Sequence, residues 1–157
     1  MYDAITIADE ILKIAKSQGK TLTPLQLMKL VYISYGWGLA ILDKQLFQNR
    51  IEAWKFGPVI PDLYQATKHF GKETIPLASI DINSNVDSET ESLLNGVFKQ
   101  YGKHSGVYLS GLTHTSGSPW DQVYHDGVMG IEIPDSKIRD HYKGLLDARN
   151  SSSRTTN

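Results

Sequence analysis

Apolar side chains recur at steps of three and four residues in the first segment of the chain. Ile5, Leu12 and Ala15 lie on one such face, which is typical of an amphipathic helix. Asp3 precedes the pattern and is suited to cap its start, and Gly19 follows it as a left-handed stop. The sequence therefore predicts a helix between these two residues.

The next segment has the clearest helix start in the chain. Thr23-Pro24-Leu25-Gln26 combines a hydroxyl cap, a proline in the first turn and a glutamine three residues on, which is a capping box. The run that follows, residues 25–42, is apolar nearly all round, with Lys29 as its one charge. Such a pattern indicates a helix buried on every side. Gly36 and Gly38 predict that a neighbouring element approaches it closely.

The middle of the chain has a different sequence pattern. Ile51–Phe56 is predicted to be extended, and Gly57-Pro58 is predicted to break that strand. Residues 131–133 form a second short strand in this interpretation, suited to pair with the first. Pro61 is placed to start a short helix that Gly71 ends.

The rest of the chain alternates turn signals with helical patterns. Residues 72–87 form a polar loop, interpreted as the most mobile part of the chain and as a source of specificity. Further helices are predicted to start with a capping box at 88–91, then near Ser105, at Ser118 with an end near Gly127, and at Asp135. The sum is a mainly α, compact single domain over residues 1–148, with six or seven helices and a small β-hairpin or short sheet. Residues 149–157 are interpreted as a flexible C-terminal tail.

Composition narrows the function classes. The 157 residues suit one domain, and 16 Lys and Arg against 17 Asp and Glu give a net charge of −1, so no global charge favours nucleic acid or an anionic membrane. Absence of cysteine and of a basic leader predicts a cytoplasmic protein. The most apolar stretch, residues 30–42, falls short of the roughly 20 residues that a membrane span needs.

Candidate chemistry is sparse. The five histidines lack metal-ligand spacing, and neither a phosphate-binding loop nor a Gly-x-Ser-x-Gly motif occurs. We therefore predict no catalytic residue, no metal and no cofactor. An enzyme that uses His114 with a nearby serine stays open as an alternative. The lysines of the first two helices, including Lys29, are interpreted as a solvated face, which argues against nucleic acid as a partner.

Two segments combine aromatic, proline and histidine residues unusually densely: residues 54–61, WKFGPVIP, and residues 113–120, THTSGSPW. The simpler interpretation is that their aromatics are buried under the core. The sharper one is that both line a shared surface for a protein partner.

Three stretches together resemble a known family. They are LQLMKLVY at 25–32 with Gly36-Trp37, EAWKFGPVIPDLY at 52–64, and Leu112-Thr113-His114 with Gly117-Ser118-Pro119-Trp120. This combination is similar to the Panacea domain, a family of SocA-like antitoxins and phage-associated GepA-like proteins, and the likeness covers residues 4–146. Met28 departs mildly from the family pattern, where a glutamine is usual before the lysine.

The resemblance implies an antitoxin of a type II-like toxin–antitoxin system, which neutralises a cognate protein toxin from an adjacent gene by direct binding. As an alternative it implies an adaptor that delivers the toxin to a protease, which would then be a further partner. A DNA-binding autorepressor that uses the first two helices is a separate alternative, and the near-neutral charge argues against it. It brings no catalytic residue. It marks as toxin-binding or motif positions Lys29, Trp54, Lys55, Phe56, Gly57, Pro58, Tyr64, Thr113, His114 and Trp120.

Overall fold

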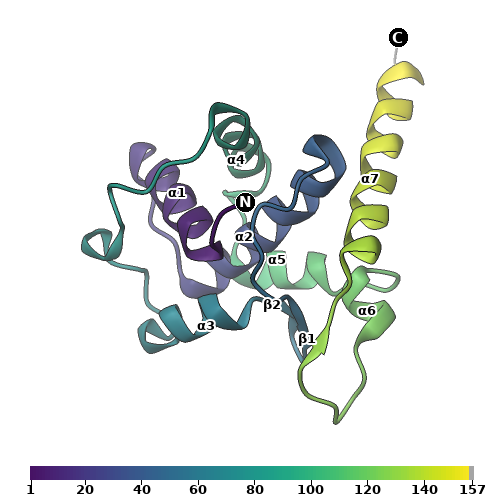
Figure 1. The fold of residues 1–157 in the computed structure, drawn as a ribbon, viewed down its shortest axis with the longest axis horizontal. Coiled ribbons are helices and arrows are strands. Elements are labelled where there is room, and N and C mark those ends of the chain that lie inside the picture. The colour runs from purple at the N-terminus through teal and green to yellow at the C-terminus, as the bar shows by residue number, and fades with distance from the viewer. Residues whose placement is uncertain (156–157) are drawn as a thin grey trace.

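The computed structural model describes residues 1–155 and shows a mainly helical domain, as the sequence predicted (Figure 1). Within these residues there are seven α-helices and one small sheet of three strands. The helices are α1 (Ala4–Ser17), α2 (Pro24–Trp37), α3 (Pro61–Thr67), α4 (Ser88–Tyr101), α5 (Gly106–Thr113), α6 (Pro119–Val123) and α7 (Asp135–Thr155). The strands are β1 (Glu52–Trp54), β2 (Gly57–Val59) and β3 (Ile131–Glu132).

Helix α2 is the centre of the core. Every residue from Leu27 to Trp37 is buried, and α1, α4, α5 and α7 surround the helix (Figure 1). The predicted capping box is present: the backbone N–H of Gln26 donates to Thr23 Oγ1, and that of Thr23 donates to Gln26 Oε1. A π-turn, Gly38–Leu42, continues the helix. The long apolar run is thus helical, and the helices packed around it bury it on all sides.

Length and composition alone would let Pro24–Leu42 cross a membrane. In the structure, however, 72% of its most apolar window is buried inside the protein. This is the pattern of a core helix.

The two glycines of this run admit close neighbours, as predicted. The ring of Tyr142 in α7 lies directly over Gly36, and the side chain of Leu46 lies over Gly38. A side chain at either glycine would collide with its neighbour, because an added Cβ would fall 2.3 Å from Tyr142 and 2.9 Å from Leu46. The glycines therefore set the distance between α2 and the elements that cover it.

The sheet has the order β2-β1-β3, and both pairings are antiparallel. The predicted pairing of the segment after Gly130 with β1 is confirmed, with Ala53 opposite Ile131. The prediction that Gly57-Pro58 breaks the strand is wrong. These residues form β2 and fold back on β1, with Trp54 opposite Gly57, because Lys55 and Phe56 make a tight two-residue turn.

Three boundaries differ from the sequence prediction. Helix α6 ends at Val123 and not near Gly127, and α7 continues through Thr155, past the predicted end before Arg149. The capping box predicted at residues 88–91 is not formed. Asp87 is the cap residue of α4, and its carboxylate accepts from the hydroxyls of Thr90 and Tyr2 instead of from the helix backbone. The flexibility of residues 149–157 stays a prediction, and residues 156–157 lie outside the described part.

The segment between α3 and α4, residues 72–87, is anchored at several points. Its apolar residues Ile75, Ile80 and Val86 are buried in the core. The backbone N–H of Ile75 donates to the Leu22 carbonyl, and Lys13 of α1 donates to the Ser84 carbonyl. The loop thus wraps α1, and the mobility expected for it stays a prediction.

Of the two capping boxes that the sequence predicts, the one at Thr23 is formed and the one at Ser88 is not, and this difference can be tested. We expect Thr23→Ala to lower the free energy of unfolding by about 1 kcal/mol, because it leaves a helix N–H without its acceptor. Ser88→Ala is expected to stay within about 0.5 kcal/mol of the wild type, since Ser88 caps nothing. Urea unfolding of both variants measures this, and equal losses would contradict the assignment of the caps.

Candidate functional site

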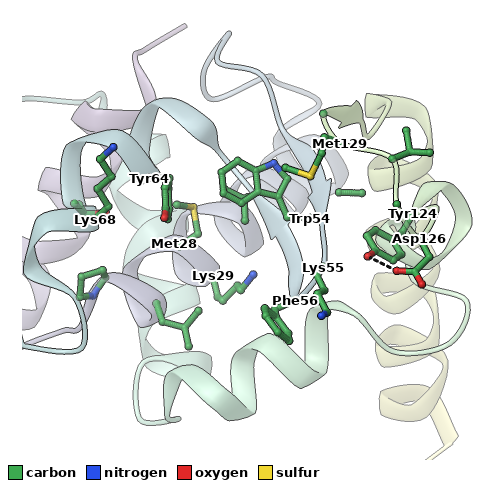
Figure 2. Close-up of a pocket in the computed structure, with 18 of the residues that line it drawn as sticks. Met28, Lys29, Trp54, Lys55, Phe56, Tyr64, Lys68, Tyr124, Asp126 and Met129 are labelled. Atoms are coloured by element: carbon green, nitrogen blue, oxygen red, sulfur yellow. Dashed lines mark hydrogen bonds between the residues drawn. The ribbon is translucent and has the colours of Figure 1, made fainter.

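An open groove of about 620 Å³ lies beside the β1–β2 hairpin. Its walls come from the first turns of α2, from the hairpin, from α3 and from the loop that joins α6 to β3. The side chains that shape it are Leu25, Met28, Lys29, Trp54, Lys55, Phe56, Tyr64, Lys68, Tyr124, Asp126, Val128 and Met129 (Figure 2). Most of this surface is apolar, which suits a binding site for a ligand or a partner's side chains.

Lys29 borders the groove from its floor. The residue is only 1% exposed, and its Nζ donates a hydrogen bond of 2.8 Å to the Pro58 carbonyl oxygen. Burial lowers the pKa of the Lys29 ammonium to about 8, because an apolar surrounding disfavours the charged form. The expectation that Lys29 belongs to a solvated lysine face is therefore wrong: β2 packs across α2 and covers it.

Gly57 makes room for this lysine. Its φ is +123°, in a region that side-chain-bearing residues rarely adopt. An added Cβ at Gly57 would also lie 2.9 Å from Lys29 Nζ. Met28, the departure from the family pattern, accepts a hydrogen bond on Sδ from the backbone N–H of Ile60, at 3.3 Å. The hairpin is thus fastened to α2 by two neighbouring side chains.

Trp54 forms one wall of the groove. Its ring meets that of Tyr64 edge to face, with 5.0 Å between the centroids. Its indole N–H donates to Glu52 Oε1 at 2.9 Å. This bond, together with the ion pair to Arg50, holds the pKa of the Glu52 carboxyl below its usual value. The Trp54 ring is therefore held by an aromatic contact and by a hydrogen bond to a carboxylate that is paired with Arg50.

Arg50 links the α6–β3 loop, which forms the wall opposite Trp54, to the sheet. Its guanidinium donates to Glu52 on β1, to Glu132 on β3 and to the carbonyl of Gly130. The last bond holds the end of the α6–β3 loop, which carries Met129. Figure 2 shows the Met129 side chain extending towards the indole of Trp54, so the loop and the hairpin face each other across the groove.

A second layer of aromatics supports the hairpin from behind. The indole N–H of Trp120 donates to the Trp54 carbonyl. The Trp120 ring stacks on Tyr124 with centroids 4.6 Å apart and meets His114 edge to face at 5.4 Å. The predicted THTSGSPW segment is thus packed against the WKFGPVIP segment.

The remaining polar side chains of this layer bond to backbone carbonyls. His114 Nδ1 contacts the Ser110 carbonyl oxygen, so this nitrogen carries the proton. The Ser110 hydroxyl donates to the Phe56 carbonyl at 2.7 Å, and Thr113 donates to carbonyls of its own helix. Ser110 therefore supports the hairpin turn, and its hydroxyl is not bonded to His114.

The structure brings together all ten predicted site residues, in two groups. Lys29, Trp54, Lys55, Phe56 and Tyr64 line the groove. Gly57 and Pro58 belong to the hairpin, Trp120 donates a hydrogen bond to it, and Thr113 and His114 lie next to Gly57.

Sequence reasoning missed the opposite wall, which the α6–β3 loop supplies with Tyr124, Asp126, Val128 and Met129. A signal was present: Val128 and Met129 are two apolar residues between glycines in a loop. Among residues 1–155, His, Cys, Asp and Glu side chains nowhere gather in threes that could hold a metal.

The groove exposes large apolar side chains. Phe56 at the hairpin tip is 71% exposed and Met129 is 85% exposed. Adjoining exposed apolar patches of this kind mark interaction surfaces, and aromatic and methionine side chains are enriched in them. The arrangement is thus an exposed, mainly apolar groove with one buried cation under it.

Comparison with known proteins identifies the family of this chain. Residues 27–121 match the model of the antitoxin SocA-like, Panacea domain family, and the chain belongs to this family. Antitoxin SocA of Caulobacter vibrioides (strain NA1000 / CB15N) is 30% identical over 155 residues, which cover 90% of this chain and 82% of that protein. A search of the solved structures found no significant match.

Proposed function

We propose that the protein is an antitoxin that neutralises a cognate protein toxin by direct binding in the cytoplasm, and that the hairpin groove is its docking surface. The observation that carries the proposal is the convergence of the family motif. Three stretches far apart in the sequence supply it, and their residues meet at one hairpin whose outer side is an exposed apolar groove.

The name of the relative, antitoxin SocA, supports the antitoxin role. The physical basis is that of an ordinary protein interface. A stable complex buries about 800 Å² on each partner, and a few anchor side chains supply most of the affinity. Phe56, Tyr64 and Met129 are such side chains, and Arg50 and Trp120 hold their supports in place.

Toxicity rescue tests the function itself. The product of the adjacent gene is expressed from an inducible promoter, with and without this protein, and the tagged protein is then purified from the rescued cells. We expect growth to be restored and the toxin to co-purify. Lack of rescue by the wild-type protein would contradict the antitoxin proposal, and a shortened toxin half-life in a pulse-chase would indicate delivery to a protease.

Two substitutions of equal exposure test the position of the surface. Phe56→Ser removes an aromatic ring that is 71% exposed in the groove, and Ile82→Ser removes an apolar side chain that is 72% exposed on the 72–87 loop. We expect Phe56→Ser to weaken toxin binding roughly 30-fold, the effect of losing one central anchor. Ile82→Ser is expected to change it less than about threefold.

Isothermal titration calorimetry of the purified pair measures both values. The matched exposure makes the comparison fair, since neither residue holds the core together and both changes remove similar apolar surface. The reverse order of effects would place the docking surface on the 72–87 loop instead.

A further inference from the structure

Lys29 is unusual for a buried lysine because no acid neutralises it. None of the ion pairs found in residues 1–155 includes Lys29. Its ammonium has three N–H donors, and the hydrogen bond to the Pro58 carbonyl uses one of them. A buried cation without a counter-ion costs free energy, and the one hydrogen bond that fastens the hairpin leaves two of its N–H donors without an acceptor among these contacts.

The rim of the groove carries the same sign of charge. Lys55, at the hairpin tip, and Lys68, at the end of α3, are exposed and line the groove, and neither takes part in an ion pair of the described structure. One acid, Asp126, also lines the groove, and its carboxylate accepts from the Tyr124 hydroxyl. Three lysines against one aspartate leave the groove positive.

Much of the remaining lining is apolar. Met28, Trp54, Tyr64 and Met129 contribute to it (Figure 2). A purely acidic ligand would leave this surface uncovered, and a purely apolar one would leave Lys29 buried and unpaired. A segment that combines a large apolar side chain with a carboxylate satisfies both.

We propose that the groove recognises a segment of the toxin in which a large apolar side chain lies next to an Asp or Glu. The apolar side chain fills the space between Trp54 and Met129. The carboxylate is attracted by Lys29 from the floor and meets Lys55 or Lys68 at the rim. This inference rests on the proposed function and names the chemistry of the partner at that same surface.

Zero-length cross-linking tests it on the purified complex. A carbodiimide joins a carboxylate to a lysine amine only where the two groups are in contact, and mass spectrometry then identifies the pair. We expect an Asp or Glu of the toxin, beside a large apolar residue, to be linked to Lys55 or Lys68, because these two amines are exposed. A complex whose cross-links all lie on other lysines, or which forms none, would overturn the inference and leave the antitoxin function standing.

A binding series gives a second, independent measurement. Lys29→Met keeps the volume of the side chain and removes its charge, so we expect the Kd for the toxin to rise at least tenfold and its salt dependence to weaken. Lys99→Met, on the exposed face of α4, is the matched control and should change the Kd less than threefold. Unchanged binding by Lys29→Met would overturn the inference.

The outcomes distinguish failure of this inference from failure of the proposed function. They also distinguish an Asp or Glu side chain of the toxin from the toxin's C-terminal carboxylate. Absence of any complex with the wild-type protein contradicts the proposed function itself. Cross-links of the groove lysines solely to the C-terminal carboxylate of the toxin would overturn the assignment to a side chain. Loss of binding by Lys29→Met supports the inference only if the variant is folded. Urea unfolding of the same variant establishes whether it is.

Discussion

Lys29→Met is expected to raise the free energy of unfolding at pH 7, although it removes a buried hydrogen bond. The pKa of Lys29 is lowered from 10.5 to about 8 in the folded protein, and a shift of this size corresponds to about 3 kcal/mol of destabilisation while the group is charged. Methionine avoids this cost. It leaves the Pro58 carbonyl without its donor, which costs about 1 kcal/mol, so we expect a net gain of about 2 kcal/mol.

The pH dependence identifies the cause. Because the pKa of Lys29 is lower in the folded state, the unfolded chain binds more protons between about pH 8 and 10.5. The wild type therefore gains stability as the pH rises through this window, and the advantage of Lys29→Met shrinks over the same range. Taking the difference between the two proteins cancels the titration of the buried tyrosines, whose pKa values are raised.

Urea unfolding of both proteins at pH 7, 8, 9 and 10 measures this difference. A variant that is clearly less stable than the wild type at pH 7, by an amount that does not change with pH, would contradict the prediction. It would mean that the Pro58 bond outweighs the burial of the charge. A gain in stability together with a loss of toxin binding would show that the lysine is kept for its function.

The second large effect is expected from Gly36→Ala. The added Cβ would lie 2.3 Å from two ring atoms of Tyr142, and the ring cannot retreat freely. It packs edge to face against Trp37, with centroids 5.2 Å apart, and against Tyr32, and it is 4% exposed. We expect a loss of about 3 kcal/mol, the upper end for an overpacked core, and a Tm lower by roughly 6–12 °C.

Gly96→Ala is the matched control. Gly96 also lies inside a helix, α4, but no atom lies within 4 Å of an added Cβ there. Alanine is the better helix former, so this variant is expected to be more stable by about 0.5–1 kcal/mol. Calorimetric unfolding of the two variants gives opposite signs if close packing of α7 on α2 is the cause. A loss of similar size in both would point to glycine's general role in helices instead.

Local signals in the sequence were strong enough to predict the core helix. The capping box of Thr23 and Gln26 is made within four residues, so the pattern needs no distant partner to be formed. The apolar run after it was correctly predicted to be buried, and its glycines to admit a neighbour. The second capping box, predicted from the same kind of signal at Ser88, is not formed. There, Asp87 has distant Tyr2 as an additional partner, and its carboxylate bonds to hydroxyls.

The hairpin shows where local reasoning was wrong. Gly57-Pro58 is a common strand breaker, and yet it forms β2. Proline is tolerated because β2 is an edge strand, where a missing N–H leaves no ladder bond unmade. The positive φ of Gly57 and its nearness to Lys29 depend on the packing of the hairpin over α2, which no local pattern expresses.

By itself the sequence determined the class of fold, the buried character of α2, and the motif stretches from which the family could be identified. Those properties follow from hydrophobic periodicity and capping, which act over a few residues. The tertiary structure alone decided that Lys29 is buried, that Met129 faces Trp54, and that a positive groove lies between them. Burial and charge environment depend on which distant segments cover a side chain. Here those segments are β2 and the loop that Arg50 holds at Gly130.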